Sequence, residues 1–324
     1  MKSLLRLSVC LAIATLCVLP FAGCGKKKKK TSNQLTIGIS IPSADHGWTG
    51  GVVWWAEQAK QDWETRDPNV KVIVSTAKDA SEQVDKVENL MVQGIDALVI
   101  LPHDPSPLTG ICEQVANAGI YLVVVDRGID RPVQNLYLAG DNAGFGRGGA
   151  ESIVRALNGK GKILVMEGIP CTVNSIRVDA FNEVIKQHPG IEILESQSAY
   201  WDTEKGLKLM ENYLQKYPQI DAVWTGDDDV LLGALKAYEE SGRKDIKCFV
   251  GGAGSKVIVK RILDGDELIP FDVTYPPRMI AEGVDYAIMG LRGELQDDLK
   301  TVIIPAEIIT RENAENYYYP DSIF

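Results

Sequence analysis

The sequence predicts an α/β protein with two Rossmann-like lobes, whose parallel sheets are flanked by helices and joined by a multi-strand hinge. Short apolar runs alternate with helical patterns, the alternation begins again near Gly144, and 324 residues are too many for one compact core. Runs as uniformly apolar as 121–125 are typical of strands buried on both faces, as in parallel sheets covered by helices.

The first half of the chain contains four predicted strands and three predicted helices. We expect strands at 36–41, 70–75, 97–101 and 121–125, and helices at 48–66, from Ser81 onward, and at 108–118. Ser81 is the expected N-cap of the second helix, and Gly119 the C-cap of the third. The segment Asp126-Arg127-Gly128 ends the fourth strand.

The second half repeats this alternation. Helices are expected at 144–157, 175–187, 203–216, 229–241, 256–263 and 276–289, and strands or extended segments at 162–167, 192–199, 221–225, 247–251, 268–273, 302–304 and 308–309. The late helix is expected to cross back to the first lobe. The predicted first lobe is therefore 35–140 plus 275–300, and the predicted second lobe is 141–274 plus 301–324.

The composition and the net charge indicate which kinds of molecule the protein binds. Hydrophobic residues make up 45% of the chain and charged residues 24%, which is ordinary for a globular protein. The formal net charge is −10, whereas a general nucleic-acid binder needs a basic surface to displace counterions. We therefore expect no nucleic-acid partner.

The N-terminal segment has the features of an export signal. Two basic residues, Lys2 and Arg6, precede an apolar run at 7–21 that is too short to span a membrane comfortably. Phe21-Ala22-Gly23-Cys24 resembles the bacterial lipobox, in which the cysteine thiol receives a lipid before cleavage. We expect a signal peptide at 1–23, lipidation of Cys24 and a lysine-rich tether at 24–34. The alternative is an ordinary signal peptide with an incidental cysteine.

The lysine-rich tether and the cysteines after Cys24 say less about function than the signal segment does. The lysines at 26–30 suit either a solvated spacer or adhesion to anionic lipid headgroups. Downstream of Cys24 the chain has Cys112, Cys171 and Cys248, an odd number without motif spacing, so a disulfide framework is not expected. Cys112 and Cys248 are expected to be buried as small hydrophobic residues. Cys171 follows a strand-to-helix turn and has no assigned role.

Ligands of open α/β sheets bind outside the carboxyl ends of the strands. The predicted strand-end segments contain two tryptophans, two arginines and several carboxylates; these segments are 42–48, 102–104, 126–128, 168–177, 200–202, 226–229, 252–255 and 274–275. Flat rings stack on the C–H face of a sugar, and Asp and Arg form charge-assisted hydrogen bonds with hydroxyls. The mixture favours a polyhydroxyl ligand.

From Leu35 to Pro305 the chain resembles the type I periplasmic binding proteins, which are solute-binding proteins of ABC transporters, and in layout it is closest to ribose binders. The resemblance is carried by the order and spacing of four pieces: Lys86 to Ile100, Val125-Asp126-Arg127, Leu138-Ala139-Gly140-Asp141-Asn142, and Asp221-Ala222-Val223-Trp224 followed by Leu232-Gly233-Ala234-Leu235.

The resemblance implies a set of ligand-binding residues. These are a polar contact at His46, stacking aromatics at Trp48 and Trp201, a clamp of Asp126 and Arg127, the second lobe's arginine at Arg177, and contacts at Asp227 and Thr274. Three positions depart from ribose binders: Ala253 replaces an Asp, Thr274 a Gln and Asp227 an Asn. These departures argue against ribose itself, and the resemblance implies a sugar or polyol without identifying which one.

Some of these patterns also have simpler explanations. Trp48 and Trp201 could be core residues, although their turn positions favour a ligand role. The run Asp227-Asp228-Asp229 looks like a metal cluster, but consecutive residues before a helix are better explained as one ligand contact plus helix caps. The stretch 144–149 fits G-x-G-x-x-G without the context of a dinucleotide site, so we expect helix packing there. We expect no cofactor, no metal and no catalytic residue.

The predicted mechanism is a hinge-closing trap with three chain crossings, near Gly140-Asp141, at 272–274 and at 300–302. The predicted protein is a monomeric lipoprotein, periplasmic or at the cell surface and anchored through its lipid, which passes a sugar or polyol to an ABC permease. An alternative is a receptor subunit that presents its closed form to a histidine kinase. A lactose-repressor-like regulator would need a DNA-binding segment, and an enzyme would need a nucleophile–base pair in the cleft.

Overall fold

The structure is a computed structural model that describes residues 34–44 and 46–324. The predicted signal peptide, Cys24 and the tether up to Asn33 lie outside the described residues. Within the described part, none of the helices is long and apolar enough to cross a membrane.

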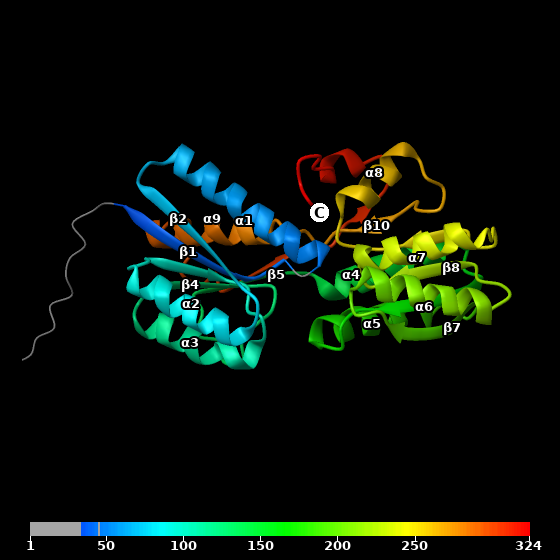
Figure 1. Ribbon diagram of the computed structural model, residues 1–324, viewed down its shortest axis with the longest axis horizontal. Helices are drawn as coiled ribbons and strands as arrows, with labels where there is room; N and C mark the ends of the chain where they lie inside the picture. The colour runs from blue at the N-terminus through cyan, green and yellow to red at the C-terminus, as the bar shows by residue number, and fades with distance from the viewer. Residues whose placement is uncertain (1–33, 45) are drawn as a thin grey trace, which may run out of the picture. The chain divides into compact units, whose positions relative to one another are not determined.

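The first lobe is built on a parallel six-stranded sheet (Figure 1). Its strands, in the order β11-β5-β4-β3-β1-β2, are β1 (Leu35–Pro42), β2 (Val70–Ala77), β3 (Ala97–Ile100), β4 (Tyr121–Val125), β5 (Leu136–Gly140) and β11 (Thr301–Ile304). Its helices are α1 (Gly47–Arg66), α2 (Ala80–Val92), α3 (Pro105–Asn117) and α9 (Met279–Arg292).

Helices cover both faces of this sheet, because alternate residues of each strand point to opposite sides. On β3, Leu98 and Ile100 join the core under α2 and α3, whereas Val99 joins the core under α1 and α9. Helix α9 contacts α1, β1 and β4 although it comes much later in the chain, and Figure 1 shows the orange helix beside the blue strand.

The position of residues 301–304 differs from the predicted division of the chain. These residues were expected in the second lobe, but β11 pairs in parallel with β5 at the edge of the first sheet. A short strand with alternately half-buried and exposed residues fits the edge of either sheet, so its sequence does not identify its partner. The third crossing therefore follows Ile304 rather than Lys300.

The second lobe has a parallel four-stranded sheet with the order β7-β6-β8-β9. Its strands are β6 (Gly161–Glu167), β7 (Ile191–Ser198), β8 (Ala222–Thr225) and β9 (Cys248–Val250), and its helices are α4 (Asn142–Ala156), α5 (Thr172–Ile185), α6 (Thr203–Lys216), α7 (Asp228–Ser241) and α8 (Lys256–Asp264). On β8, Trp224 faces the core with α4 and α5, and Val223 faces the core with α6 and α7.

The glycine-rich stretch at 144–149 lets α4 pack closely on its neighbours, which confirms the expectation of helix packing. A Cβ at Gly146 would lie 2.0 Å from the Arg177 carbonyl oxygen, and one at Gly149 would lie 2.2 Å from Trp224 Nε1. Only a residue without a side chain fits at either position.

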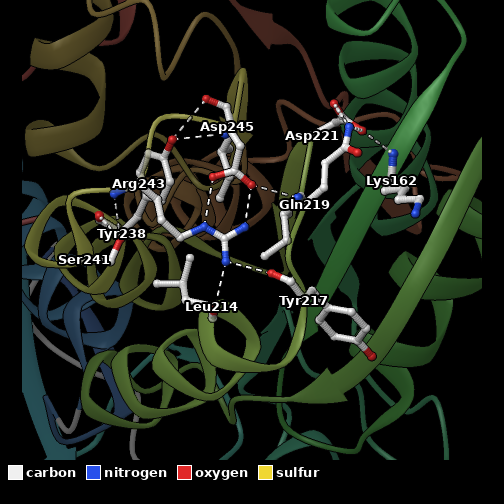
Figure 2. A network of polar contacts seen from close by, with 11 residues as sticks. Lys162, Leu214, Tyr217, Gln219, Asp221, Tyr238, Ser241, Arg243 and Asp245 are labelled. Atoms are coloured by element: carbon white, nitrogen blue, oxygen red, sulfur yellow. Dashed lines mark hydrogen bonds and ion pairs between the residues drawn. The ribbon is translucent and has the colours of Figure 1, made fainter.

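Strands β6 and β8 of the second sheet begin at the end of the sheet that lies away from their carboxyl ends. A polar network around Arg243 holds this end together (Figure 2). The Arg243 Nη1 donates to the carbonyl oxygens of Leu214 and Tyr217 at 2.6 and 2.7 Å, at the C-terminus of α6. Asp245 accepts from this guanidinium and from the Ile220 N–H. A cation at a helix C-terminus satisfies carbonyls that lack partners within the helix.

Two short strands join the lobes near the hinge. Strand β10 (Asp272–Val273) pairs antiparallel with β12 (Ile308–Ile309), and the short helix η1 (Ala314–Tyr317) follows. The predicted strand at 268–273 is shorter than expected, because its first part contributes only an isolated bridge between Phe271 and Val250.

The predicted cap at Ser81 was also wrong: Asp79 caps α2 by accepting from the Glu82 N–H at 2.8 Å.

The first crossing leaves no room for a side chain at Gly140, which yields a stability prediction. A Cβ there would lie 2.3 Å from Tyr275 Cε2. We expect Gly140→Ala to lower the free energy of unfolding by about 1–3 kcal/mol, because the ring or the backbone must shift. Urea titration measures this change.

The matched control is Gly110→Ala in α3, where nothing lies within 4 Å of an added Cβ. There the higher helix propensity of alanine should stabilise the protein by up to about 1 kcal/mol. Equal effects at the two positions would contradict the assigned packing of Gly140.

Candidate functional site

The carboxyl ends of the strands in both sheets carry unusual backbone conformations. Positive φ angles occur at Asp126 after β4 (60°), at Tyr200 and Trp201 after β7 (60° and 53°) and at Ala253 after β9 (105°). Residues other than glycine rarely adopt such angles, and they cluster at functional sites when they do. At Asp126 the turn is held by the Tyr137 hydroxyl, which donates to its carbonyl oxygen at 2.7 Å.

Tyr275, which follows the second crossing, lies between predicted site residues of both lobes. Its hydroxyl donates to Asp126 Oδ1 and accepts from Asn142 Nδ2 at 3.2 Å. Its carbonyl oxygen accepts from Trp48 Nε1 at 2.9 Å. Burial, together with the charge of Asp126, raises the pKa of the Tyr275 hydroxyl well above its usual value, so it remains a donor at neutral pH.

Arg177 reaches the same place from α5 of the second lobe. Its side chain is 4% exposed; Nε donates to Asn142 Oδ1 at 2.9 Å, and Nη1 donates to the Gly226 carbonyl at 2.9 Å. The guanidinium lies 4.3 Å from the centre of the Tyr275 ring and 4.1 Å from that of Phe145. Stacking on aromatic faces stabilises a buried guanidinium, so Arg177 is held in a fixed orientation.

The remaining residues of the first lobe that were predicted to contact a ligand have different partners. Arg127 donates to the His103 carbonyl at 2.8 Å, and its Nε lies 3.9 Å from Asp126 Oδ2. Trp48 is 8% exposed, and its ring centre lies 5.9 Å from that of Tyr275. The structure therefore brings Asp126, Arg177 and Trp48 together around Tyr275, with Arg127 beside Asp126.

A hollow of 410 Å³ brings His46 and Trp201 together. It is lined by the start of α1, the turns after β6 and β7, and the starts of α6 and α7: His46, Gly47, Ile169, Tyr200, Trp201, Asp202, Thr203, Glu204 and Asp229. Across the hollow, His46 Nδ1 of the first lobe lies 3.7 Å from Asp229 Oδ2 of the second lobe. This contact joins the two lobes. Trp48, Asp126, Arg127, Arg177, Asp227 and Thr274 do not line this hollow.

The three consecutive aspartates at the start of α7 have separate roles. Asp227 caps the helix by accepting from the Val230 N–H at 2.9 Å. Asp228 is fully buried and accepts from the N–H groups of Gly252 and Ser255. Asp229 faces His46. The arrangement matches the expected caps, and within residues 34–44 and 46–324 no cluster of ligating side chains is arranged to hold a metal ion.

Burial dominates the electrostatics of this acidic group. It raises the pKa of Asp227 to about 8, with a further contribution from the charge of Asp229. Burial likewise raises the pKa of Asp272, in β10, to about 7, and it raises that of Asp228 well above its usual value, with a contribution from Asp272. Burial therefore favours the neutral form of each of these carboxyl groups.

Thr274 lies at the hinge itself. Its hydroxyl oxygen accepts from the Glu307 N–H at 2.9 Å, and its own N–H donates to the Glu307 carbonyl at 2.9 Å.

Sequence reasoning missed Asn142, Phe145 and Tyr275, which complete the surroundings of Arg177. Tyr275 stood in a predicted strand-end segment, and a polar aromatic there was the available signal.

The buried carboxyls predict how stability depends on pH. Asp272 has a usual pKa of 3.8 and a folded-state pKa of about 7, so between these values the folded state binds protons that the unfolded state has lost. This contribution to stability is complete below about pH 4 and is lost as the pH rises through 7. We expect Asp272→Asn to reduce the fall in melting temperature between pH 4 and 8.

Thermal unfolding of the protein at a series of pH values measures this dependence. The exposed Asp85, in α2, supplies the control, because Asp85→Asn should leave the pH profile unchanged. An Asp272→Asn variant as pH-dependent as the unchanged protein would contradict the assignment.

Comparisons with known proteins agree with the observed geometry. Residues 37–294 match the family model described as a periplasmic binding protein domain. The ribose import binding protein of Bacillus subtilis is 30% identical over 288 residues, which are 86% of this chain and 88% of the relative. The xylitol-binding protein of Mycolicibacterium smegmatis is 27% identical over 253 residues, which are 76% of this chain and 70% of the relative.

Solved structures show the same architecture. An ABC transporter solute-binding protein from Bacillus halodurans with bound myo-inositol has a TM-score of 0.77 and 27% identity, covering 89% of this chain and 98% of its own. The fructose-binding periplasmic domain of a hybrid two-component system has a TM-score of 0.74 and 25% identity, covering 87% and 93%. With two parallel α/β lobes and a polar, aromatic site at their strand ends, the chain belongs to the periplasmic binding protein family, has the type I fold, and is a solute-binding protein rather than an enzyme.

Proposed function

We propose that the protein captures a sugar or polyol between two closing lobes and delivers it to an ABC-type permease. The observation that carries the proposal is the convergence of Asp126 and Trp48 from the first lobe with Arg177 from the second around one buried point. A carboxylate, a guanidinium and aromatic rings are the groups that hold hydroxyls and the C–H face of a sugar.

Closure follows from the different contacts that a ligand makes in the open and closed forms. The crossings are few and are bonded to one another: the Asp141 N–H donates to the Ile304 carbonyl at 2.9 Å, and the Thr274 N–H donates to that of Glu307 at 2.9 Å. A ligand that touches both lobes binds the closed form more tightly and shifts the equilibrium toward it by that difference.

The ligand class follows from the available groups. Ala253 and Thr274 offer fewer hydrogen bonds than the Asp and Gln of ribose binders, and Asp227 adds a carboxyl group. Relatives include a xylitol-binding protein and a structure with bound myo-inositol, which supports a polyol as well as a sugar. His46 and Trp201, which meet at the hollow, remain candidate ligand contacts.

The same proposal includes the attachment of the protein to a membrane and its protein partners. Cleavage before Cys24 and lipidation of its thiol would anchor the protein at the outer face of a membrane, as a monomer beside its permease. The fructose-binding domain of a two-component system supports a second candidate, a receptor that presents its closed form to a histidine kinase. Neighbouring genes for a permease and ATPase, or for a kinase, distinguish the two.

Calorimetry with D-ribose, D-allose, xylitol and myo-inositol tests the binding function. We expect at least one to bind, and Asp126→Asn to weaken that binding at least tenfold, because hydrogen bonds to a charged group contribute about 1.5–3 kcal/mol. Asp85→Asn on the exposed face of α2 should leave the affinity unchanged. Binding that survives at full affinity in Asp126→Asn would show that the cleft residues are misassigned.

A further inference from the structure

Asn142 follows the first crossing as the first residue of α4, and its backbone is held there by two of the crossings. The preceding residue, Asp141, caps α4 by accepting from the Gly144 N–H at 2.7 Å. The N–H of Asp141 donates to the Ile304 carbonyl, where the third crossing begins. The Asn142 side chain therefore extends from a backbone that is tied to the hinge.

The two ends of the Asn142 side chain bond to two different residues of the candidate site. The amide oxygen accepts from Arg177 Nε at 2.9 Å, and the amide nitrogen donates to the Tyr275 hydroxyl at 3.2 Å. The Tyr275 hydroxyl in turn donates to Asp126 Oδ1. These four residues form one continuous chain of hydrogen bonds from the second lobe to the first.

The chemistry of its two ends gives this chain of hydrogen bonds a single direction. A guanidinium can only donate, so the Asn142 atom that faces Arg177 must be the amide oxygen. The amide nitrogen, which also can only donate, then faces the Tyr275 oxygen. The phenol proton is left for the carboxylate of Asp126, which accepts it.

This chain of hydrogen bonds determines which atoms of Arg177 are left for a ligand. Nε is bonded to Asn142, and Nη1 is bonded to the Gly226 carbonyl. Within the described part of the chain, no group accepts a hydrogen bond from Nη2. The rings of Phe145 and Tyr275 lie against the guanidinium, so it cannot turn another nitrogen outward without breaking one of these bonds.

The other end of the chain of hydrogen bonds acts on Asp126 in the same way. Oδ1 accepts the proton of the Tyr275 hydroxyl, whereas Oδ2 lies 3.9 Å from Arg127 Nε and accepts no hydrogen bond from the residues that the structure describes. A carboxylate has about four acceptor positions, two of them on each oxygen. Oδ2 therefore keeps its acceptor positions for a hydroxyl of the ligand.

We propose that Asn142 is a positioning residue of the binding site, which orients Arg177 Nη2 and Asp126 Oδ2 toward the same ligand. The inference rests on the proposed sugar-binding function and deepens it, because it gives a role to a residue that does not itself contact the ligand. An amide suits this role, since it offers an acceptor to the arginine and a donor to the tyrosine without carrying a charge.

Asn142→Asp tests the donor end alone, because it keeps the shape of the side chain and the acceptor for Arg177. Its ionised carboxylate accepts from the Tyr275 hydroxyl and draws the phenol proton away from Asp126. Calorimetry uses D-ribose, D-allose, xylitol and myo-inositol as probes, and we expect the affinity for a probe that the unchanged protein binds to fall about tenfold. A melting temperature within a few degrees of that of the unchanged protein separates this loss from unfolding.

A double-mutant cycle separates positioning from packing. Asn142→Ala and Tyr275→Phe both remove the bond between the amide and the phenol, and we expect each to lower the affinity for the same probe about tenfold. Because the two changes remove a shared bond, the double variant should lose clearly less than the roughly hundredfold that independent changes would give.

The matched controls are Asn89→Asp and Asn89→Ala, at an exposed asparagine of α2, which should leave the affinity unchanged. Full affinity in either Asn142 variant, or a hundredfold loss in the double variant, overturns the proposal. If the unchanged protein binds none of the probes, the proposed function fails and the positioning role fails with it. Binding by the unchanged protein together with unaffected Asn142 variants shows that the positioning role alone is wrong.

Discussion

The hydrogen bond from the Tyr275 hydroxyl to Asp126 joins the hinge to the candidate site, and Trp48 and Arg177 contact the same tyrosine. Tyr275 follows the crossing that brings the chain back to the first lobe, so its backbone is part of the hinge. Its side chain contacts Asp126 of the first lobe and Arg177 of the second. The positions of these candidate binding groups are therefore coupled to the geometry of the crossings.

The parallel sheets explain why these groups meet. All strands of one parallel sheet end at the same edge, and residues that follow these ends in the two lobes meet, as His46 and Asp229 do. The strand-end turns are tight enough to require positive φ angles at Asp126 and Trp201. Buried carboxyls hold the loop at 252–255 from two directions: Asp228 at the start of α7 accepts from the N–H groups of Gly252 and Ser255, and Asp272 at the hinge accepts from that of Gly254.

Sequence periodicity was sufficient to predict the regular helices and strands. It was insufficient for short strands at a sheet edge or at the hinge. Apolar runs such as 97–101 and 121–125 predicted buried strands, and the structure contains them with small changes at the ends. Residues 301–304 and 268–273 were misjudged in partner or length, because a few half-buried residues satisfy several pairings equally well. The cap of α2 was misplaced at Ser81, because the hydroxyl of Ser81 and the carboxylate of Asp79 can accept the same kind of hydrogen bond.

The sequence by itself determined the fold class, the two-lobed alternation and the residues that stand at strand ends, because these follow from local patterns of apolar and turn-forming residues. Only the tertiary structure decided which of these residues meet. It brought His46 and Trp201 to one hollow, and Asp126, Arg177 and Trp48 to Tyr275. Such contacts join residues up to 227 positions apart, and they depend on the packing of both lobes at the hinge, which no local pattern records.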